Sequence, residues 1–238
     1  MKNRTIFASS LIELIEAQRY GVEYQPIIDL KSKDIMAYEC LARFSDRNNN
    51  YIPPDIIYSA LHKSPLSLFQ VEYQQKILQL DNAPRHSDIF VNLDQDSYFA
   101  AKRSDEDNPF LALFKTFRTA NIVVELIENS EINDAIKSLD MIDTLANNNI
   151  NTAIDDVCNP LSMISTSVIQ LVDYIKLDKY VVAQKHNREF MLLVKAIIGF
   201  AHSAGKKIIL EGVETESDIV FARQINADYV QGFLFKKW

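Results

Sequence analysis

Eight short apolar runs, most of them followed by a segment of helical periodicity, constrain the fold of this chain more than any other feature. The runs are rich in β-branched and aromatic residues and cover Val22–Leu30, Asp34–Phe44, Ile89–Leu93, Ile122–Ile127, Thr152–Asp155, Tyr174–Leu177, Lys207–Leu210 and Tyr229–Phe235. Helical patterns cover Phe110–Thr119, Asp134–Asn147, Glu189–Ala204 and Glu216–Ile225. Asn133 and Thr215 are predicted helix N-caps, and Gly205 is predicted to end the third of these helices. The alternation predicts an α/β fold, and eight strands favour a TIM-like (β/α)8 barrel over an open sheet.

The first two runs depart from the barrel pattern. Only Lys31-Ser32-Lys33 lies between them, which is too short for a crossover helix, so these strands are predicted to pair as an antiparallel hairpin. The barrel would therefore have an irregular antiparallel first strand. The pattern through Leu11–Ile15 predicts an amphipathic helix before it. We expect a single domain over 1–238, in which 1–21 form an N-terminal helix leading into the barrel.

The composition excludes several classes of function. The chain has 5 glycines in 238 residues, each isolated in sequence, so neither G-x-G-x-x-G nor a Walker phosphate loop can be written. A formal net charge of −7 argues against binding to a nucleic-acid polymer or a membrane surface, which requires a basic face. Two cysteines do not make a disulfide framework, and no apolar run approaches the ~20 residues of a membrane span. We expect a reduced, cytoplasmic protein.

Polar side chains gather where a barrel enzyme carries its chemistry, at the carboxyl ends of the strands. They are Glu39, Asn92, Glu125, Asp155, Asp156, Lys176, Glu211 and Gln231. A single carboxylate at a strand end is usually solvated or caps a helix. Scattered solvated charges would fall at both ends of the strands, whereas these residues gather at one end. Carboxylates buried together raise one another's pKa unless a cation lies among them. Oxygen ligands without cysteine or histidine favour Mg²⁺ or Mn²⁺ over zinc.

The Asp155-Asp156 pair points to two cations, because one carboxylate can bridge two metals while its neighbour binds the second. Two ions roughly 3.5–4 Å apart suit an in-line attack on phosphorus. Lys176 should stay protonated among the acids and could orient the attacking water or balance charge on the phosphate. The sequence lacks the residue patterns of other catalytic sites, because the four histidines are dispersed and no G-x-S-x-G or C-x-x-C sequence exists. The residues therefore predict metal-dependent phosphodiester hydrolysis.

Eight short motifs make the chain similar to a known family. They are Tyr24-Gln25-Pro26-Ile27-Ile28-Asp29, Glu39-Cys40-Leu41-Ala42-Arg43, Val91-Asn92-Leu93, Glu125-Leu126-Ile127-Glu128, Asp155-Asp156, Lys176-Leu177-Asp178, Glu211-Gly212-Val213-Glu214-Thr215 and Gln231-Gly232-Phe233-Leu234-Phe235. With these motifs in order, the chain resembles the EAL-domain family of bacterial phosphodiesterases, which hydrolyse cyclic di-GMP to linear pGpG. The resemblance spans about Tyr24 to Phe235. It implies two Mg²⁺ or Mn²⁺ ions per active site, cyclic di-GMP as the ligand and a homodimer.

The resemblance also implies a role for each site residue. The metal ligands would be Glu39, Asn92, Glu125, Asp155 and Asp156. The catalytic set would be Glu39, Lys176, Glu211 and Gln231, in which Lys176 and Glu211 position or deprotonate the attacking water and Gln231 holds the water network. The dinucleotide would contact Gln25, Leu41, Arg43, Glu214 and Phe235, with Arg43 on a phosphate. Glu128 would steady the loop that follows Asp155-Asp156.

Two segments depart from the family pattern. The family follows its Asp-Asp pair with the flexible loop F-G-T-G-Y-S-S-L, whereas Val157–Ile164 contains no glycine here and includes Pro160. Proline fixes φ, so we expect a stiffer loop. In Pro53–Leu80, the usual A-E-x-x-G pattern is replaced by Ala60-Leu61-His62-Lys63-Ser64. We expect that helical segment to lie away from the chemistry.

Three functions remain open from sequence alone. The first is a metal-dependent cyclic di-GMP phosphodiesterase. The second is a cyclic di-GMP receptor without turnover, in which the altered loop impairs metal binding. The third is a protein-interaction domain that no longer binds the nucleotide, although such relatives usually lose several metal ligands and this chain has lost none. The length leaves no room for a sensory or diguanylate-cyclase module, so we expect any regulation to come through expression, dimerisation or a separate protein.

Overall fold

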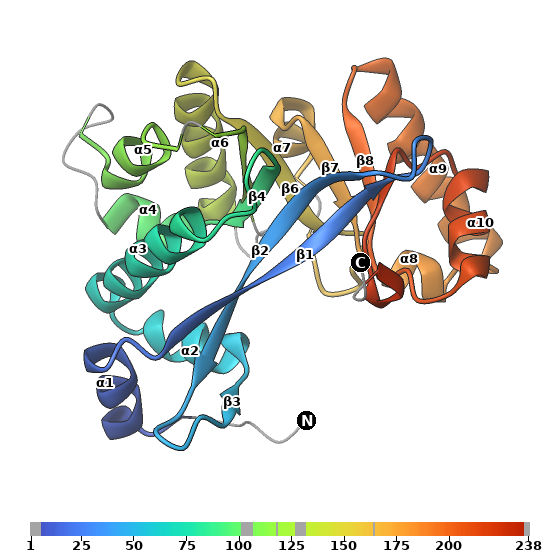
Figure 1. Cartoon of the computed structure of the whole chain (residues 1–238). Coiled ribbons are helices and arrows are strands. Elements are labelled where there is room, and N and C mark those ends of the chain that lie inside the picture. The colour runs from blue at the N-terminus through green and yellow to red at the C-terminus, as the bar shows by residue number, and fades with distance from the viewer. Residues whose placement is uncertain (1–5, 101–106, 118, 127–131, 164, 236–238) are drawn as a thin grey trace.

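A computed structural model describes residues 6–100, 107–117, 119–126, 132–163 and 165–235 (Figure 1). Its barrel strands are β1 (Tyr20–Asp29), β2 (Ile35–Ser45), β4 (Asp88–Asn92), β5 (Ile122–Leu126), β6 (Asn151–Val157), β7 (Tyr174–Leu177), β8 (Lys207–Leu210) and β9 (Tyr229–Val230). The sheet runs β1-β9-β8-β7-β6-β5-β4-β2, and the antiparallel β1–β2 pairing closes it into a ring. The predicted TIM-like barrel with an antiparallel first strand is confirmed.

Helices connect the strands and pack outside the closed ring. They are α1 (Ala8–Glu16), α2 (Pro54–Leu61), α3 (Pro65–Asp81), α4 (Gln95–Ala100), α5 (Pro109–Phe114), α6 (Ile132–Asn147), α7 (Thr166–Leu171), α8 (Tyr180–Ala183), α9 (Arg188–Ser203) and α10 (Glu216–Gln224). Thr215 caps α10 in a capping box with Asp218, and Gly205, with φ +75°, follows the end of α9, both as predicted. The predicted N-cap Asn133 is wrong, because α6 already begins at Ile132.

Two predicted elements are shorter than expected. The last apolar run is a strand only to Val230, because the chain turns at Gly232 against the Val213 backbone and continues as the 3₁₀ helix Phe233–Phe235. The helix predicted over Phe110–Thr119 ends at Phe114, where i→i+3 hydrogen bonds replace the α-helical ones and Thr116 Oγ1 donates to the Leu113 carbonyl at 2.6 Å. A short strand that sequence did not indicate, β3 (Tyr51–Ile52), pairs with the end of β2.

Inside the barrel, an apolar layer supports a polar one. The apolar layer holds one residue from each strand: Ile27, Ala37, Phe90, Val123, Ala153, Tyr174, Ile209 and Tyr229. Successive side chains of a strand point to opposite faces, so the next inward position lies two residues along. Those positions hold Gln25, Glu39, Asn92, Glu125, Asp155, Lys176, Glu211 and Gln231, which we call the polar layer. The two-residue period of the strands thus places the polar side chains in one layer, next to the apolar layer.

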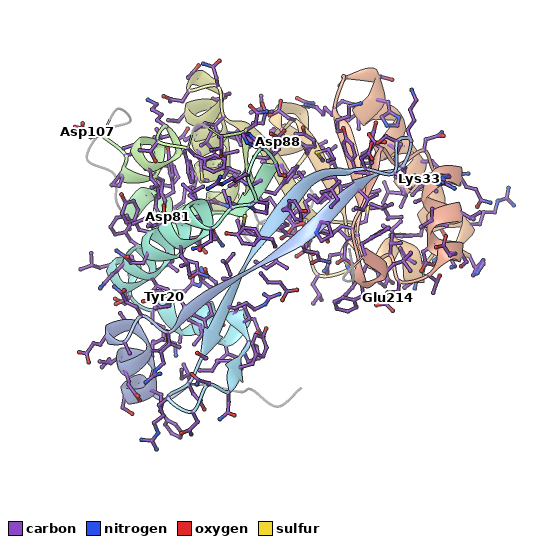
Figure 2. The ribbon with its side chains drawn as sticks, viewed as in Figure 1. Tyr20, Lys33, Asp81, Asp88, Asp107 and Glu214 are labelled. Carbon is purple, nitrogen blue, oxygen red and sulfur yellow. The ribbon has the colours of Figure 1, made fainter. Side chains whose placement is uncertain are left out.

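The polar layer lies at the carboxyl ends of the parallel strands. Figure 2 shows the hairpin loop at Lys33 and the start of β4 at Asp88 on the upper side of the molecule, and Glu214, after β8, on the lower side. On that lower side the β1–β2 hairpin extends past the other strands (Figure 1). Its extension carries a small second core with α1, α2 and α3, formed by Leu14, Phe44, Ile57, Leu61, Leu68 and Val71.

Helix α3 fastens this hairpin to the barrel with buried amides. Gln79 Nε2 donates to the Cys40 carbonyl at 2.8 Å, and Gln75 Nε2 donates to the Gly21 carbonyl at 2.6 Å. Beyond Cys40, β2 no longer pairs with β4, so these amides satisfy backbone groups that the sheet leaves open. The expectation that Pro53–Leu80 lies away from the chemistry is therefore wrong for α3, which holds the strand that carries Glu39.

Two glycines give opposite predictions for substitution by alanine. A Cβ on Gly232 would overlap the Val213 backbone, whereas a Cβ on Gly199, inside α9, would meet nothing within 4 Å. We expect Gly199→Ala to raise the free energy of unfolding by roughly 0.5–1 kcal/mol, because alanine favours the helix. We expect Gly232→Ala to lower it by about 1–3 kcal/mol through overpacking. Urea unfolding followed by circular dichroism measures both, and equal stability of the two variants would contradict this account.

Candidate functional site

The polar layer centres on Lys176, a fully buried lysine on β7. Its Nζ lies 2.8 Å from Glu125 Oε1, 2.9 Å from Glu211 Oε1, 3.1 Å from Asp155 Oδ1 and 3.5 Å from Glu39 Oε1. Burial acts to lower the pKa of Lys176, but Asp155 and the other three carboxylates raise it well above its usual value. The lysine is therefore charged and balances the negative charge of the cluster.

Glu39, at the centre of β2, is held by two side-chain amides. Asn92 Nδ2 donates to Glu39 Oε1 at 3.1 Å, and Gln231 Nε2 donates to Glu39 Oε2. Burial raises the pKa of Glu39, but the charge of Lys176 and these hydrogen bonds outweigh it, so the pKa lies below its ordinary value. Glu39 is thus an ionised carboxylate of fixed orientation.

The other carboxylates of the cluster hold protons more tightly than free acids do. Burial, with the nearby charge of Glu39, raises the pKa of Glu125 well above its ordinary value and raises that of Asp155 as well. Burial and the charge of Asp155 raise the pKa of Glu211 to about 8. One lysine does not neutralise four acids, so the cluster retains excess negative potential that favours protons or cations.

A bulge in β6 lets both aspartates face the same site. Neighbouring residues of a regular strand point to opposite faces, so Asp155 and Asp156 could not both face the barrel mouth without an irregularity. The register between β6 and β7 shifts between Ile154 and Val157, and Asp156 has a φ of +56°. Sequence reasoning missed this bulge, although two adjacent aspartates at a barrel mouth require one. Burial and the charge of Asp155 raise the pKa of Asp156 to about 6.

The residues fit a pair of divalent cations. Two carboxylate triads, Glu39–Glu125–Asp155 and Asp155–Asp156–Glu211, each bring ligand oxygens within 4.8 Å of one another, and they share Asp155. Glu125 Oε2 and Gln231 Oε1 are buried without a hydrogen-bond partner among the described residues. Buried oxygens of this kind are costly unless a donor or cation meets them. Asn92, the fifth predicted ligand, lies beside the first triad through its bond to Glu39.

A third acidic group, between the end of α2 and the start of α4, does not resemble a cation site. His62 Nε2 lies 2.7 Å from Asp94 Oδ2, and Asp96 is close by. Lys137 Nζ already lies 2.6 Å from Asp96 Oδ1, so an ammonium occupies the place that a cation would take.

Three of the predicted dinucleotide contacts line one pocket, beside the hairpin extension. This hairpin pocket, of about 600 Å³, is lined by Glu23, Gln25, Leu41, Arg43, Tyr51 and Phe233. The structure does not bring Phe235 there, because that ring is 3% exposed and packs in the main hydrophobic core. Phe233, 62% exposed, lines the pocket instead. The closing motif contains both phenylalanines, and sequence alone does not show which one the 3₁₀ turn directs outward.

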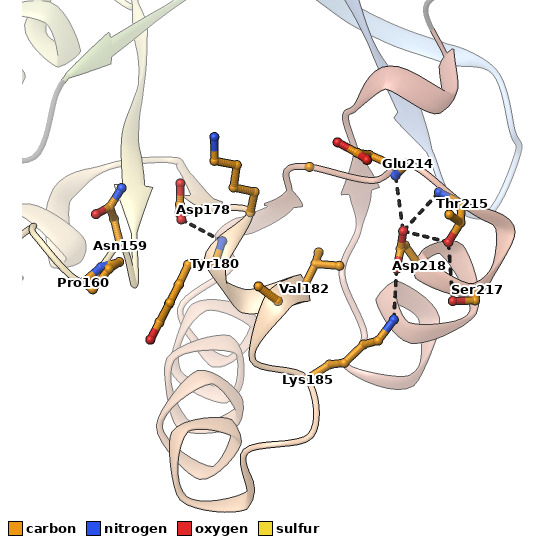
Figure 3. A pocket seen from close by; sticks show the side chains of 13 residues that line it. Asn159, Pro160, Asp178, Tyr180, Val182, Lys185, Glu214, Thr215, Ser217 and Asp218 are labelled. Atoms are coloured by element: carbon orange, nitrogen blue, oxygen red, sulfur yellow. Dashed lines mark hydrogen bonds and ion pairs between the residues drawn. The ribbon is translucent and has the colours of Figure 1, made fainter. Parts of the chain in front are cut away.

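Glu214 lines a second pocket, which Figure 3 shows from close by. This pocket of about 720 Å³ lies between the loops after β6, β7 and β8, with Asn159, Asp178 and Tyr180 on one wall and Thr215 on the other. Asp178 Oδ1 accepts the Tyr180 N–H at 2.7 Å, which orders the β7 loop.

The loop after Asp156 adopts a turn that normally favours glycine. Cys158 stands where the family pattern has its first loop glycine, and its φ is +73°. Asn159 Oδ1 then accepts the Leu161 N–H at 3.0 Å, and Asn159 N–H donates to the Asp156 carbonyl at 3.0 Å. Glu128, predicted to steady this loop, lies outside the described residues.

Comparison with known proteins agrees with the motifs. The sequence model of the EAL domain matches residues 8–237. A probable cyclic di-GMP phosphodiesterase, PdeG of Escherichia coli (strain K12), is 25% identical over 221 residues, which cover 90% of this chain and 43% of PdeG. The chain therefore spans less than half the length of that relative.

Solved structures share the fold. The PaMucR phosphodiesterase in its c-di-GMP complex matches with a TM-score of 0.74 and 22% identity, over 96% of this chain and 95% of that one. The calcium and cyclic di-GMP complex of BlrP1 from Klebsiella pneumoniae matches with a TM-score of 0.73 and 18% identity, over 92% and 55%. At these identities the likeness concerns the fold. In the part of the chain that the structure describes, every helix is too short or too polar to cross a bilayer.

The raised carboxyl pKa values predict how cation affinity depends on pH. A cation near Glu211 favours the ionised form of that carboxyl, whose pKa is about 8, so below that pH cation binding is coupled to the release of a proton. We expect the affinity for Mn²⁺ to rise by about tenfold per pH unit for each proton displaced, and to level off above the pKa. Calorimetry at several pH values, in two buffers of different ionisation enthalpy, measures the affinity and the protons released. Glu211→Gln should reduce the number of protons released and the slope of the pH dependence, and a wild-type affinity independent of pH would contradict the assignment.

Proposed function

The chain belongs to the EAL-domain family, and we propose that it hydrolyses cyclic di-GMP to linear pGpG at the polar layer with two Mg²⁺ or Mn²⁺ ions. The observation that carries the proposal is the pair of carboxylate triads that share Asp155 and surround Lys176. A merely structural salt-bridge network would match its acids with cations, whereas this one leaves an excess of buried carboxylates at the mouth of a barrel.

In this proposal Glu39, Glu125, Asp155, Asp156 and Asn92 hold the ions. Two bound divalent ions lower the pKa of a water molecule and stabilise the charge that develops on the attacking and leaving oxygens. The protein's own part is to fix the ligands, which it does through the amides of Asn92 and Gln231 on Glu39 and through the β6 bulge. Oxygen donors without histidine suit Mg²⁺ or Mn²⁺.

Lys176 and Glu211 are the residues that handle the proton and the charge of the reaction. Their atoms Nζ and Oε1 lie 2.9 Å apart, so a water or phosphate oxygen held by one lies within reach of the other. Lys176 stays protonated and stabilises negative charge, while Glu211, with a pKa of about 8, is suited to accept a proton near neutral pH.

The two pockets suit a ligand with two bases. One pocket, with Gln25, Arg43 and the exposed ring of Phe233, lies on the hairpin side of the polar layer, and the other, with Glu214, lies on the opposite side. An exposed aromatic ring can stack on a purine, and an arginine can bind phosphate without a glycine-rich loop. We therefore propose Phe233, in place of the predicted Phe235, as the aromatic contact of the ligand.

Glu39→Ala tests the cation site directly. We expect it to abolish pGpG formation, because it removes a ligand of the first triad, while the apolar layer keeps the barrel folded. The assay incubates protein with cyclic di-GMP and Mn²⁺ and identifies the product by chromatography, and circular dichroism checks the fold. Glu16→Ala, on the exposed face of α1, is the matched control. Wild-type turnover in Glu39→Ala would overturn the assignment. If the wild-type protein binds cyclic di-GMP but forms no pGpG, the chain is a receptor for the dinucleotide.

Lys176→Met separates turnover from binding. We expect kcat to fall by at least about 100-fold with a much smaller change in KM, because the ammonium acts on charge that develops in the reaction. Single-turnover kinetics with excess enzyme measures the chemical step. Lys207→Met is the control, since Lys207 pairs with Asp228 at the opposite end of the barrel. If KM rises and kcat is unchanged, the role of Lys176 is in binding alone.

A further inference from the structure

We propose that Glu23 limits the affinity of this protein for its anionic ligand by holding Arg43 in an internal ion pair. The inference rests on the proposed function, in which Arg43 binds a phosphate of the dinucleotide. It adds a residue that the family motifs do not contain, because Glu23 lies immediately before the Tyr24-Gln25-Pro26-Ile27 motif.

The hairpin register places the two residues on one face. Gly21 pairs with Arg43, Glu23 with Leu41, and Gln25 with Glu39, so Glu23 is the diagonal neighbour of Arg43 in the antiparallel ladder. Glycine at position 21 leaves the space opposite Arg43 without a side chain, since an added Cβ would lie 3.4 Å from Arg43 Cβ. The guanidinium therefore leans along the strand toward Glu23.

The ion pair uses the donors that a phosphate would need. Arg43 Nε and Nη2 both donate to Glu23 Oε2, at 2.9 and 2.7 Å, and Nη1 donates to the Ala42 carbonyl at 2.8 Å. The edge formed by Nε and Nη2 is one of the two that bind a phosphate bidentately. A phosphate that binds Arg43 must displace the Glu23 carboxylate from this edge of the guanidinium or bind at the other edge.

The Glu23–Arg43 ion pair lies where a bound ligand would compete with Glu23 for the guanidinium. Both side chains line the hairpin pocket together with Gln25 and Phe233, and both are partly exposed, at 27% for Arg43 and 37% for Glu23. The ion pair is thus open to exchange with a ligand.

Calorimetric titration with Ca²⁺ in place of Mn²⁺ measures affinity for cyclic di-GMP and for cyclic di-AMP. We expect Glu23→Gln to bind both ligands about three- to tenfold more tightly than the wild type, with KM for cyclic di-GMP in Mn²⁺ lowered and kcat unchanged. In an Arg43→Ala background the same substitution should give no gain, because the effect acts through Arg43. Glu13→Gln is the matched control, since Glu13 also pairs with an arginine, Arg19 at 3.5 Å, outside the hairpin pocket.

Each outcome separates this inference from the proposed function. Weaker binding of both ligands by Glu23→Gln would show that Glu23 preorganises Arg43, and weaker binding of cyclic di-GMP alone would show that it recognises guanine. Either result, or unchanged affinity, overturns the inference. Absence of pGpG with the expected gain in affinity overturns the proposed hydrolysis and supports the inference. A gain in affinity that persists in the Arg43→Ala background, or that Glu13→Gln reproduces, would reflect the net charge of the protein. Either result also overturns the inference.

Discussion

The charge balance around Lys176 is the interaction on which the rest of the site depends. A lysine with no exposed surface contacts three carboxylates on β2, β5 and β6 and a fourth, that of Glu211, directly after β8, so its ammonium holds these four segments together at the barrel mouth. Without that charge the carboxylates would repel one another in a region of low dielectric. With it, the cluster is compact but still short of positive charge. The same lysine therefore stabilises the cluster, and the negative charge that remains favours added cations.

The antiparallel hairpin extends this site beyond the barrel. A regular parallel strand would end near the level of the polar layer, as β4 does at Asn92 and β8 does just below Glu211. Strands β1 and β2 continue past that level because they pair with each other and because Gln75 and Gln79 of α3 bind their backbone. One face of the hairpin thus carries both a cluster carboxylate, Glu39, and the pocket that surrounds Arg43. In the proposed function, cation binding and ligand recognition are therefore connected through one pair of strands.

Sequence patterns predicted the placement of the polar side chains where the two-residue period of a strand determines it, because that period puts seven of the predicted residues, all but Asp156, on the inside of the barrel. They carry no signal for the backbone irregularities that leave that period. The β6 bulge brings Asp156 to the site, and the 3₁₀ turn after Gln231 exposes Phe233 and buries Phe235. Pairings between elements distant in sequence, such as Gln79 with the β2 backbone, have no local signal at all. They depend on how the helices pack.

The scarcity of glycine acquires a different meaning in the folded chain. From sequence, the loop without glycine after Asp156 is expected to be stiffer than in the family pattern. The backbone nevertheless has φ +56° at Asp156 and +73° at Cys158, so the left-handed turn forms with side chains in place. Such a conformation costs about 1–2 kcal/mol for a residue other than glycine. It persists because the bulge, the buried Val157 and the hydrogen bonds of Asn159 determine the path on both sides. The geometry of the two aspartates is therefore imposed by packing, and glycine would make it less strained without creating it.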